Sequence, residues 1–164
     1  MKIYTKRGDA GQTDLLTKRI DKTHLRIDVN GSFDESMAHI LMLKHFINDA
    51  SLKKDMDRIH QILFDVCYEI ALDDTSKPIT TKDDVLWVEQ QIDRFDQSLE
   101  RLTKFIRLDK NQASSWANMV RVTIRRAERR LIELSKQDPI NAHTLEVVNR
   151  LSDYFFTLGR FLEV

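Results

Sequence analysis

The sequence of 164 residues has little of what commonly breaks or cross-links a chain: one cysteine, two prolines and four glycines. A single cysteine, Cys67, excludes an internal disulfide framework and any metal site that needs several cysteines. Glycine and proline are rare, and both prolines, Pro78 and Pro139, stand at evident breaks in the pattern. This composition is typical of a helical protein.

The sequence also lacks an excess of charge of one sign and any long apolar run. Lys+Arg and Asp+Glu number 26 each, so no net field would draw the chain onto nucleic acid or an anionic membrane. No apolar stretch approaches the ~18 residues of a membrane-spanning helix, and the N-terminus lacks the basic-then-apolar pattern of a signal peptide. We therefore expect a soluble, cytoplasmic protein with a single domain over residues 1–164.

Apolar residues recur at intervals of three and four over most of the chain, the stripe of a helix that packs on neighbours. The first helix is predicted to open with the capping-box-like pair Ser32 and Glu35. The predicted helices cover 32–47, 54–74, 81–103, 112–136 and 140–162. The sequence thus predicts an all-α fold, a five-helix antiparallel bundle over 32–164 with an ordered N-terminal loop arm over 1–31.

The predicted arm, MKIYTKRGDAGQTDLL, shows no helical period and holds two of the four glycines. Glycines allow tight turns that bring backbone N–H groups close to an anion, and neighbouring side chains would add donors. The residues concerned are Thr5, Lys6, Arg7, Gly8, Gly11 and Thr13. No GKS/T follows, so the stretch is not a Walker A loop. A solvated arm and a phosphate-binding loop both remain open interpretations.

A second cluster, RVTIRRAERR at 121–130, holds five arginines and one glutamate in ten residues. On a helical wheel one polar group falls beside the core stripe: Asn118, Arg121, Arg125, Glu128 and Arg129. Arg126 and Arg130 lie further round. Arginine suits bidentate recognition of anions in partly dry places. The pattern is compatible with a solvated or salt-bridged face, with an anion site or, against the neutral net charge, with a nucleic-acid surface.

The last predicted helix carries polar residues inside an apolar stretch, NRLSDYFF at 149–156. Asn149, Arg150 and Asp153 occupy neighbouring turns and need polar partners there. Asn149 could complete a polar pocket with Arg125 and Glu128, or could belong to a satisfied hydrogen-bond network between helices.

No catalytic triad or metal site is evident in the sequence. The histidines show no pairing at i, i+4 of the kind that binds a metal ion. They are His24, His39, His45, His60 and His143. We therefore predict no metal-ligating residue.

Taken in order along nearly the whole chain, these stretches resemble those of a known family. TKRGDAGQTDLL, Lys22, RIDVNGSFDES, RxxxRRAERR and NRLSDYFF are similar to the motifs of PduO-type ATP:cob(I)alamin adenosyltransferases. The resemblance implies a homotrimer of helical bundles with ATP and corrinoid bound between subunits, and no nucleic-acid or membrane partner. It also implies transfer of the 5′-deoxyadenosyl group of ATP to cobalt(I) of a reduced corrinoid, cob(I)alamin, with release of triphosphate.

By the same resemblance, ATP would be bound by three parts of the chain. The N-terminal loop would contribute Thr5, Lys6, Arg7, Gly8, Asp9, Thr13, Asp14 and, further on, Lys22. The arginine helix and the last helix would contribute Arg125, Arg126, Glu128, Arg129 and Asn149. Cationic side chains and Mg²⁺ would hold the triphosphate as the C5′–O bond breaks.

The residues implied in catalysis lie at the corrinoid and at the interface between subunits. Asp34 would pair with Arg121 of another subunit, Arg125 would hold the triphosphate, and Phe105 would lie against the corrin and displace its lower axial base. Cob(I)alamin is itself the nucleophile, so the chemistry requires no catalytic Ser, Cys or His.

The segment after Phe105 departs from the family pattern. Leu108, Asp109 and Lys110 stand where Pro-Gly-Gly is usual, so the loop beside the corrin would differ in shape and charge. Two alternatives to an active enzyme therefore stay open. One is a non-catalytic relative that binds ATP or a corrinoid for sensing or delivery, and the other is a structural or nucleic-acid-binding bundle. An active enzyme could deliver its product to an adenosylcobalamin-dependent enzyme.

Overall fold

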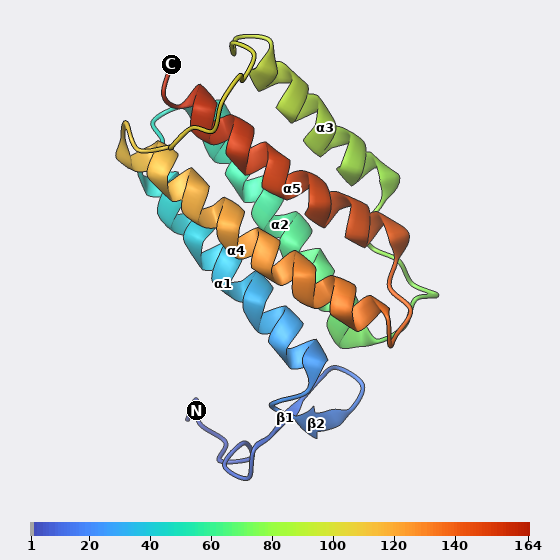
Figure 1. Cartoon of the computed structure of the whole chain (residues 1–164). Helices are drawn as coiled ribbons and strands as arrows, with labels where there is room; N and C mark the ends of the chain where they lie inside the picture. The colour runs from blue at the N-terminus through green and yellow to red at the C-terminus, as the bar shows by residue number, and fades with distance from the viewer. Residues whose placement is uncertain (1) are drawn as a thin grey trace.

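The computed structural model describes residues 2–164 and confirms a bundle of five helices, with one short two-stranded sheet near the N-terminus. The helices are α1 (Leu25–His45), α2 (Ala50–Leu72), α3 (Lys82–Asp96), α4 (Gln112–Ser135) and α5 (Ala142–Phe161). They run up and down in alternation (Figure 1). None of the described helices has the length and apolarity needed to cross a membrane.

Each helix contributes one apolar stripe to a common core. α1 packs between α2 and α4, and α5 packs between α4 and α3. α3 and α5 run in the same direction, whereas the other neighbouring pairs are antiparallel (Figure 1). α3 also reaches α2, because Arg94 pairs with Asp55 at 2.6 Å and the Arg58 guanidinium lies 4.2 Å from the ring centre of Trp87. The largest fully buried side chains include Phe33, Ile40, Met56, Leu63, Phe95, Ile124, Tyr154 and Phe155.

The predicted boundary between arm and bundle, at 31/32, is wrong, because α1 begins at Leu25. His24 is the N-cap, and its Nδ1 accepts a hydrogen bond from the backbone N–H of Arg26 at 3.2 Å. Ser32 is no cap: it lies within the helix and donates from Oγ to the carbonyl of Asp28 at 2.8 Å.

The predicted third helix is also too long, since α3 ends at Asp96 rather than near 103. Two turns close it, with the backbone N–H of Ser98 donating to Phe95 at 3.2 Å and that of Leu99 donating to Asp96 at 3.1 Å. The segment 97–111 therefore connects α3 to α4 without helix.

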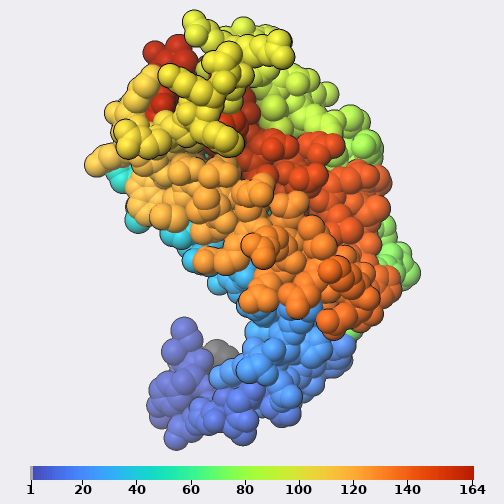
Figure 2. All heavy atoms as spheres, viewed as in Figure 1, coloured from blue at the N-terminus to red at the C-terminus, as the bar shows by residue number. Residues whose placement is uncertain are grey.

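The arm contains a small hairpin that the sequence pattern did not predict. Its strands β1 (Gln12–Asp14) and β2 (Arg19–Asp21) pair antiparallel, with Thr13 opposite Ile20. The arm stands away from the bundle at the end where α1 begins (Figures 1 and 2). One ion pair, Lys18 to Asp73 at 2.6 Å, fastens the hairpin to the end of α2.

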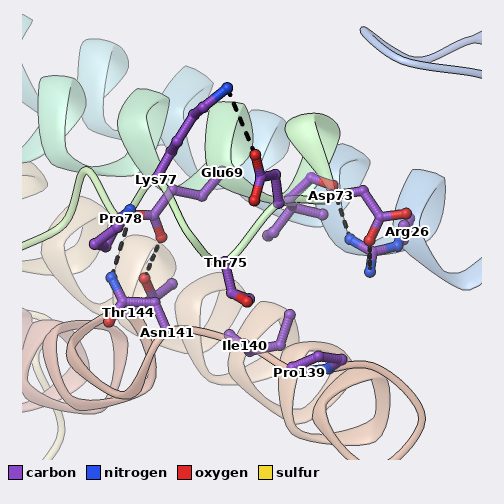
Figure 3. Close-up of a pocket in the computed structure, with 12 residues that line it drawn as sticks. Arg26, Glu69, Asp73, Thr75, Lys77, Pro78, Pro139, Ile140, Asn141 and Thr144 are labelled. Atoms are coloured by element: carbon purple, nitrogen blue, oxygen red, sulfur yellow. Dashed lines mark hydrogen bonds and ion pairs between the residues drawn. The ribbon is translucent and has the colours of Figure 1, made fainter.

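A buried arginine fixes the bundle at the base of the arm. Arg26 donates to the carbonyl of Ile70 at 2.9 Å and forms an ion pair with Asp73 (Figure 3). It forms a second ion pair with Asp138 at 2.9 Å. The adjoining cavity has a volume of about 20 Å³, which is room for one water molecule. We therefore regard this polar network as structural rather than as a ligand site.

Candidate functional site

The arginines of α4 line an open groove of about 840 Å³. Its polar lining consists of Arg121, Arg125, Arg126, Arg129, Arg130, Glu133 and Lys136. The arginines of this lining fall into two groups, those that form ion pairs with a carboxylate and those that do not. Arg126 pairs with Glu35 of α1, and Arg130 pairs with Asp28 at 3.0 Å. Among residues 2–164, no carboxylate lies within ion-pair distance of Arg125 or Arg129, so these two guanidinium groups remain available to an anion.

Arg121 occupies a drier position on the same helix. Its Nε donates to Asn118 Oδ1 at 2.9 Å. Partial burial, followed by the neighbouring charge of Arg125, lowers the pKa of Arg121. Two like charges held this close favour the arrival of an anion between or beside them.

α5 adds an amide and a carboxylate to this side of α4. With its amide oriented to satisfy both neighbours, Asn149 donates from Nδ2 to Glu128 Oε1 at 3.2 Å and accepts from Arg150 Nη1 at 3.3 Å. The expectation that Asn149 reaches the level of Glu128 is thus confirmed. Burial raises the pKa of Glu128, the charge of Arg125 lowers it in part, and the charge of Asp153 raises it again by a smaller amount.

The raised pKa of Glu128 has a measurable consequence for stability. The folded protein holds this proton more tightly than the unfolded chain, so the ionised carboxylate costs stability as pH rises above the ordinary glutamate value of 4.5. Glu128→Gln keeps the oxygen that accepts from Asn149 but carries no charge. We expect its unfolding temperature to match the wild type in acid and to exceed it slightly at pH 7, as measured by circular dichroism. A variant less stable at pH 7 than in acid, relative to wild type, would contradict this.

The arm forms tight turns, as predicted from its glycines. Lys6 and Gly11 have positive φ angles of 60° and 83°, and the backbone N–H of Gly11 donates to the carbonyl of Gly8 at 3.1 Å. An added Cβ at Gly8 would lie 3.0 Å from Lys22 Nζ, so these two residues are neighbours. The loop therefore places Lys6 and Lys22 within one small structure.

Other arm residues already pair with one another. Arg7 pairs with Asp14 at 3.2 Å, and Arg19 pairs with the same carboxylate oxygen at 2.9 Å. Thr5 Oγ1 accepts from the backbone N–H of Arg7 at 3.4 Å. Asp9 lies in the turn that follows Lys6, where its backbone N–H donates to the carbonyl of Lys6 at 3.3 Å. Thr13 lies in strand β1.

The arm and the arginine groove do not meet within one chain. Over residues 2–164, no hydrogen bond or ion pair joins the segment before Leu25 to α4 or α5. The space-filling view shows the arm standing apart from the α4 surface (Figure 2). A site built from both would need the arm of one copy and the groove of another.

Asp34 and Arg121 are likewise separated. Asp34 lies toward α2, where its charge adds to burial in raising the pKa of Cys67 to about 12. The next residue, Glu35, points toward α4 and reaches Arg126. Because Asp34 is on the α2 side of α1, the structure does not bring it to Arg121 in the same chain.

Phe105 is fully exposed on the segment 97–111. This segment lies at the end of the bundle opposite the arm (Figures 1 and 2). Leu108, which stands where a glycine turn is usual by the resemblance, is buried with only 7% of its surface exposed. The sequence pattern did not reveal that contact, nor the pairing of Arg126 with Glu35.

The fold and the groove define a class of protein: a helical bundle in which α4 presents an open groove lined with arginines, two of them without an ion pair among the described residues, while Glu128 and Asn149 lie outside the groove lining, between α4 and α5. The chain belongs to the cobalamin adenosyltransferase family, whose model matches residues 3–162.

Individual relatives agree with this assignment. A corrinoid adenosyltransferase of Bacillus subtilis is 36% identical over 98% of this chain and 86% of its own. The corrinoid adenosyltransferase PduO of Salmonella typhimurium is 34% identical over 98% of this chain, which spans 49% of that relative.

Solved structures agree in fold as well. A variant PduO-type adenosyltransferase from Lactobacillus reuteri complexed with ATP has a TM-score of 0.92 at 32% identity, covering 98% of this chain and 94% of its own. A second variant from that organism, complexed with cobalamin and ATP, has a TM-score of 0.91 at 32% identity, covering 99% and 93%.

Proposed function

We propose that the protein transfers the 5′-deoxyadenosyl group of ATP to the Co(I) centre of a reduced corrinoid, giving adenosylcobalamin and triphosphate. Co(I) supplies the electron pair of the new Co–C bond, and the C5′–O pair leaves with the triphosphate, so cobalt becomes formally Co(III). The observation that carries the proposal is the pair of unpartnered guanidinium groups, Arg125 and Arg129, beside Glu128 and Asn149.

Arg125 and Arg129 would hold the triphosphate and offset the charge that develops on it as the bond breaks. Asn149 would contact the nucleotide, while Arg126, already paired with Glu35, would contribute mainly long-range charge. The turns of the arm, with Lys6, Gly8 and Lys22, would close over the phosphates as backbone and ammonium donors.

The residues fit Mg²⁺ only as a companion of ATP. The described residues contain no group of three or more side chains that could hold a metal ion by themselves. Mg²⁺ commonly takes one or two carboxylates together with phosphate oxygens and water. Glu128 would supply such a carboxylate, and the ion would neutralise charge on the leaving triphosphate.

We propose that the working unit is a homotrimer with its sites between subunits. The separation of the arm from the groove, and of Asp34 from Arg121, supports this arrangement. Large apolar side chains are also exposed on both surfaces concerned: Leu41, Phe64 and Tyr68 on α1 and α2, and Met119 and Val122 on α4. Burial of such side chains against another copy would favour association.

Phe105 is the residue that we propose for the corrinoid side of the site. Its ring is exposed and would lie against the corrin and displace the lower axial base.

We also propose a cytoplasmic setting for the protein. A single free cysteine fits a reducing compartment, and the product would pass there to an adenosylcobalamin-dependent enzyme.

An anaerobic assay with MgATP and chemically reduced cobalamin tests the proposed activity. We expect the Co(I) absorption spectrum to convert to that of the adenosylated product, with one triphosphate released per cobalamin. Calorimetry with MgATP is the companion measurement. Binding of ATP without any spectral conversion would favour the non-catalytic alternative, and absence of ATP binding would contradict both.

A further inference from the structure

The segment 97–111 is hydrogen-bonded at both of its ends to the C-terminal end of α5. Arg160 donates to the carbonyl of Glu100 near one end. Near the other end, Asn111 Nδ2 donates to the carbonyl of Leu162 at 2.7 Å and the backbone N–H of Lys110 donates to Glu163 Oε1 at 3.0 Å. Between residues 101 and 110 every side chain is exposed except that of Leu108.

Leu108 packs directly on the α-carbon of Gly159. A Cβ built on Gly159 would lie 2.6 Å from Leu108 Cδ1, far inside normal contact, so any larger residue at 159 would push the end of the leucine side chain out of its present position. Glycine is less favourable than alanine inside a helix, and α5 continues to Phe161. The close approach of Leu108 is the physical reason for a glycine here. Ser115 Oγ, donating to the carbonyl of Leu108 at 3.1 Å, fixes the backbone at the same point.

We propose that Leu108, held on Gly159, is a positioning residue for Phe105 and thereby determines how tightly the protein holds its corrinoid. Only Ile106 and Arg107, both exposed, separate Phe105 from Leu108, so the direction of the Phe105 ring depends on where Leu108 is fixed. The inference rests on the proposed function, in which Phe105 contacts the corrin. In this chain the contact between Leu108 and Gly159 would thus take the place of the glycine turn that is usual in the family.

Three variants test the contact: Leu108→Ala, Gly159→Ala and the double variant. Leu108→Ala removes the fastening, and Gly159→Ala adds a methyl group that must displace the leucine side chain, which is flexible at its end. We expect each single change to raise the KM for cob(I)alamin about tenfold, with kcat and the affinity for MgATP retained. In the double variant the new methyl group fills the space that Leu108 Cδ1 vacated, so part of the loss should be recovered.

Trypsin cleavage after Arg101, Lys104 and Arg107 gives a readout that does not depend on corrinoid. Cleavage should be faster in each single variant and slower again in the double variant. Leu86→Ala, which truncates an exposed leucine of α3, is the matched control and should behave as wild type.

The inference would be overturned if Leu108→Ala had the same KM and the same cleavage rate as a wild-type protein that adenosylates cobalamin. Additive losses in the double variant would also overturn it, because independent damage does not reverse. If the wild type itself does not adenosylate cobalamin, the proposed function fails instead, and the cleavage rates still decide whether Leu108 fixes the segment.

Discussion

Arg125→Ala should weaken the binding of MgATP by roughly 10- to 100-fold, the effect of losing one or two charge-assisted hydrogen bonds worth about 1.5–3 kcal/mol. The guanidinium of Arg125 forms no ion pair with a carboxylate among the described residues, although its charge lowers the pKa of the half-buried Glu128 against the larger effect of burial. Because no ion pair is broken, we expect most of the loss to fall on the ligand. Titration calorimetry with MgATP measures it directly, and the adenosylation rate should fall by at least the same factor.

A matched control lies five residues further along α4. Arg130→Ala removes an equal charge from the same groove, but the Arg130 guanidinium already pairs with Asp28 at 3.0 Å and Glu133 at 3.2 Å. We expect that variant to bind MgATP within about twofold of wild type, since distant surface charges are screened by salt. Arg125→Lys should recover only part of the affinity, because an ammonium cannot form the two parallel hydrogen bonds of a guanidinium. Equal affinity in Arg125→Ala and wild type would mean that the nucleotide lies elsewhere.

The bundle could be predicted because each helix carries its own apolar stripe, and a stripe is a local property of sequence. The residue at which α1 begins could not be predicted in this way. Histidine is not among the preferred N-cap residues, and Arg26, which a sequence pattern places in solvent, is buried by Asp73 and Asp138 from distant parts of the chain. Tertiary pairing thus extended the helix beyond the pattern.

The candidate site was predictable only in the part that lies on one helix. A helical wheel placed Arg121, Arg125 and Glu128 on one side of α4, and the charge of Arg125 does act on both of the others. The groove itself is lined by the arginines, including Arg126 and Arg130, and not by Glu128. The wheel could not show which arginines are already neutralised, because Glu35 and Asp28 belong to α1. Arginines that form no ion pair can bind an anion, whereas arginines already paired with a carboxylate form a salt-bridged face, and only the structure distinguishes the two.

Reversing the charges of Asp34 and Arg121 should test whether the protein forms the proposed trimer. If the two residues pair between subunits, Asp34→Arg places two cations together, and Arg121→Asp places two anions together. We expect each single variant to lose assembly and to lower adenosylation at least about 100-fold, the scale of about 3 kcal/mol for a close interfacial charge pair. The double reversal restores opposite charges and should regain the trimer, as measured by sedimentation or light scattering.

The double reversal discriminates because Asp34 and Arg121 are not in contact within one chain. Asp34 lies beside Cys67 on the α2 side of α1, so an intramolecular repair of the pair has no geometric basis. Asp93→Arg, an exposed reversal on α3, controls for net charge and should leave both assembly and rate unchanged. Rescue of assembly without rescue of activity would assign Arg121 a second role at the ligand, consistent with its partial burial beside Arg125. Single reversals that assemble and react like wild type would instead refute the pairing, and the arm would then have to reach the groove of its partner without it.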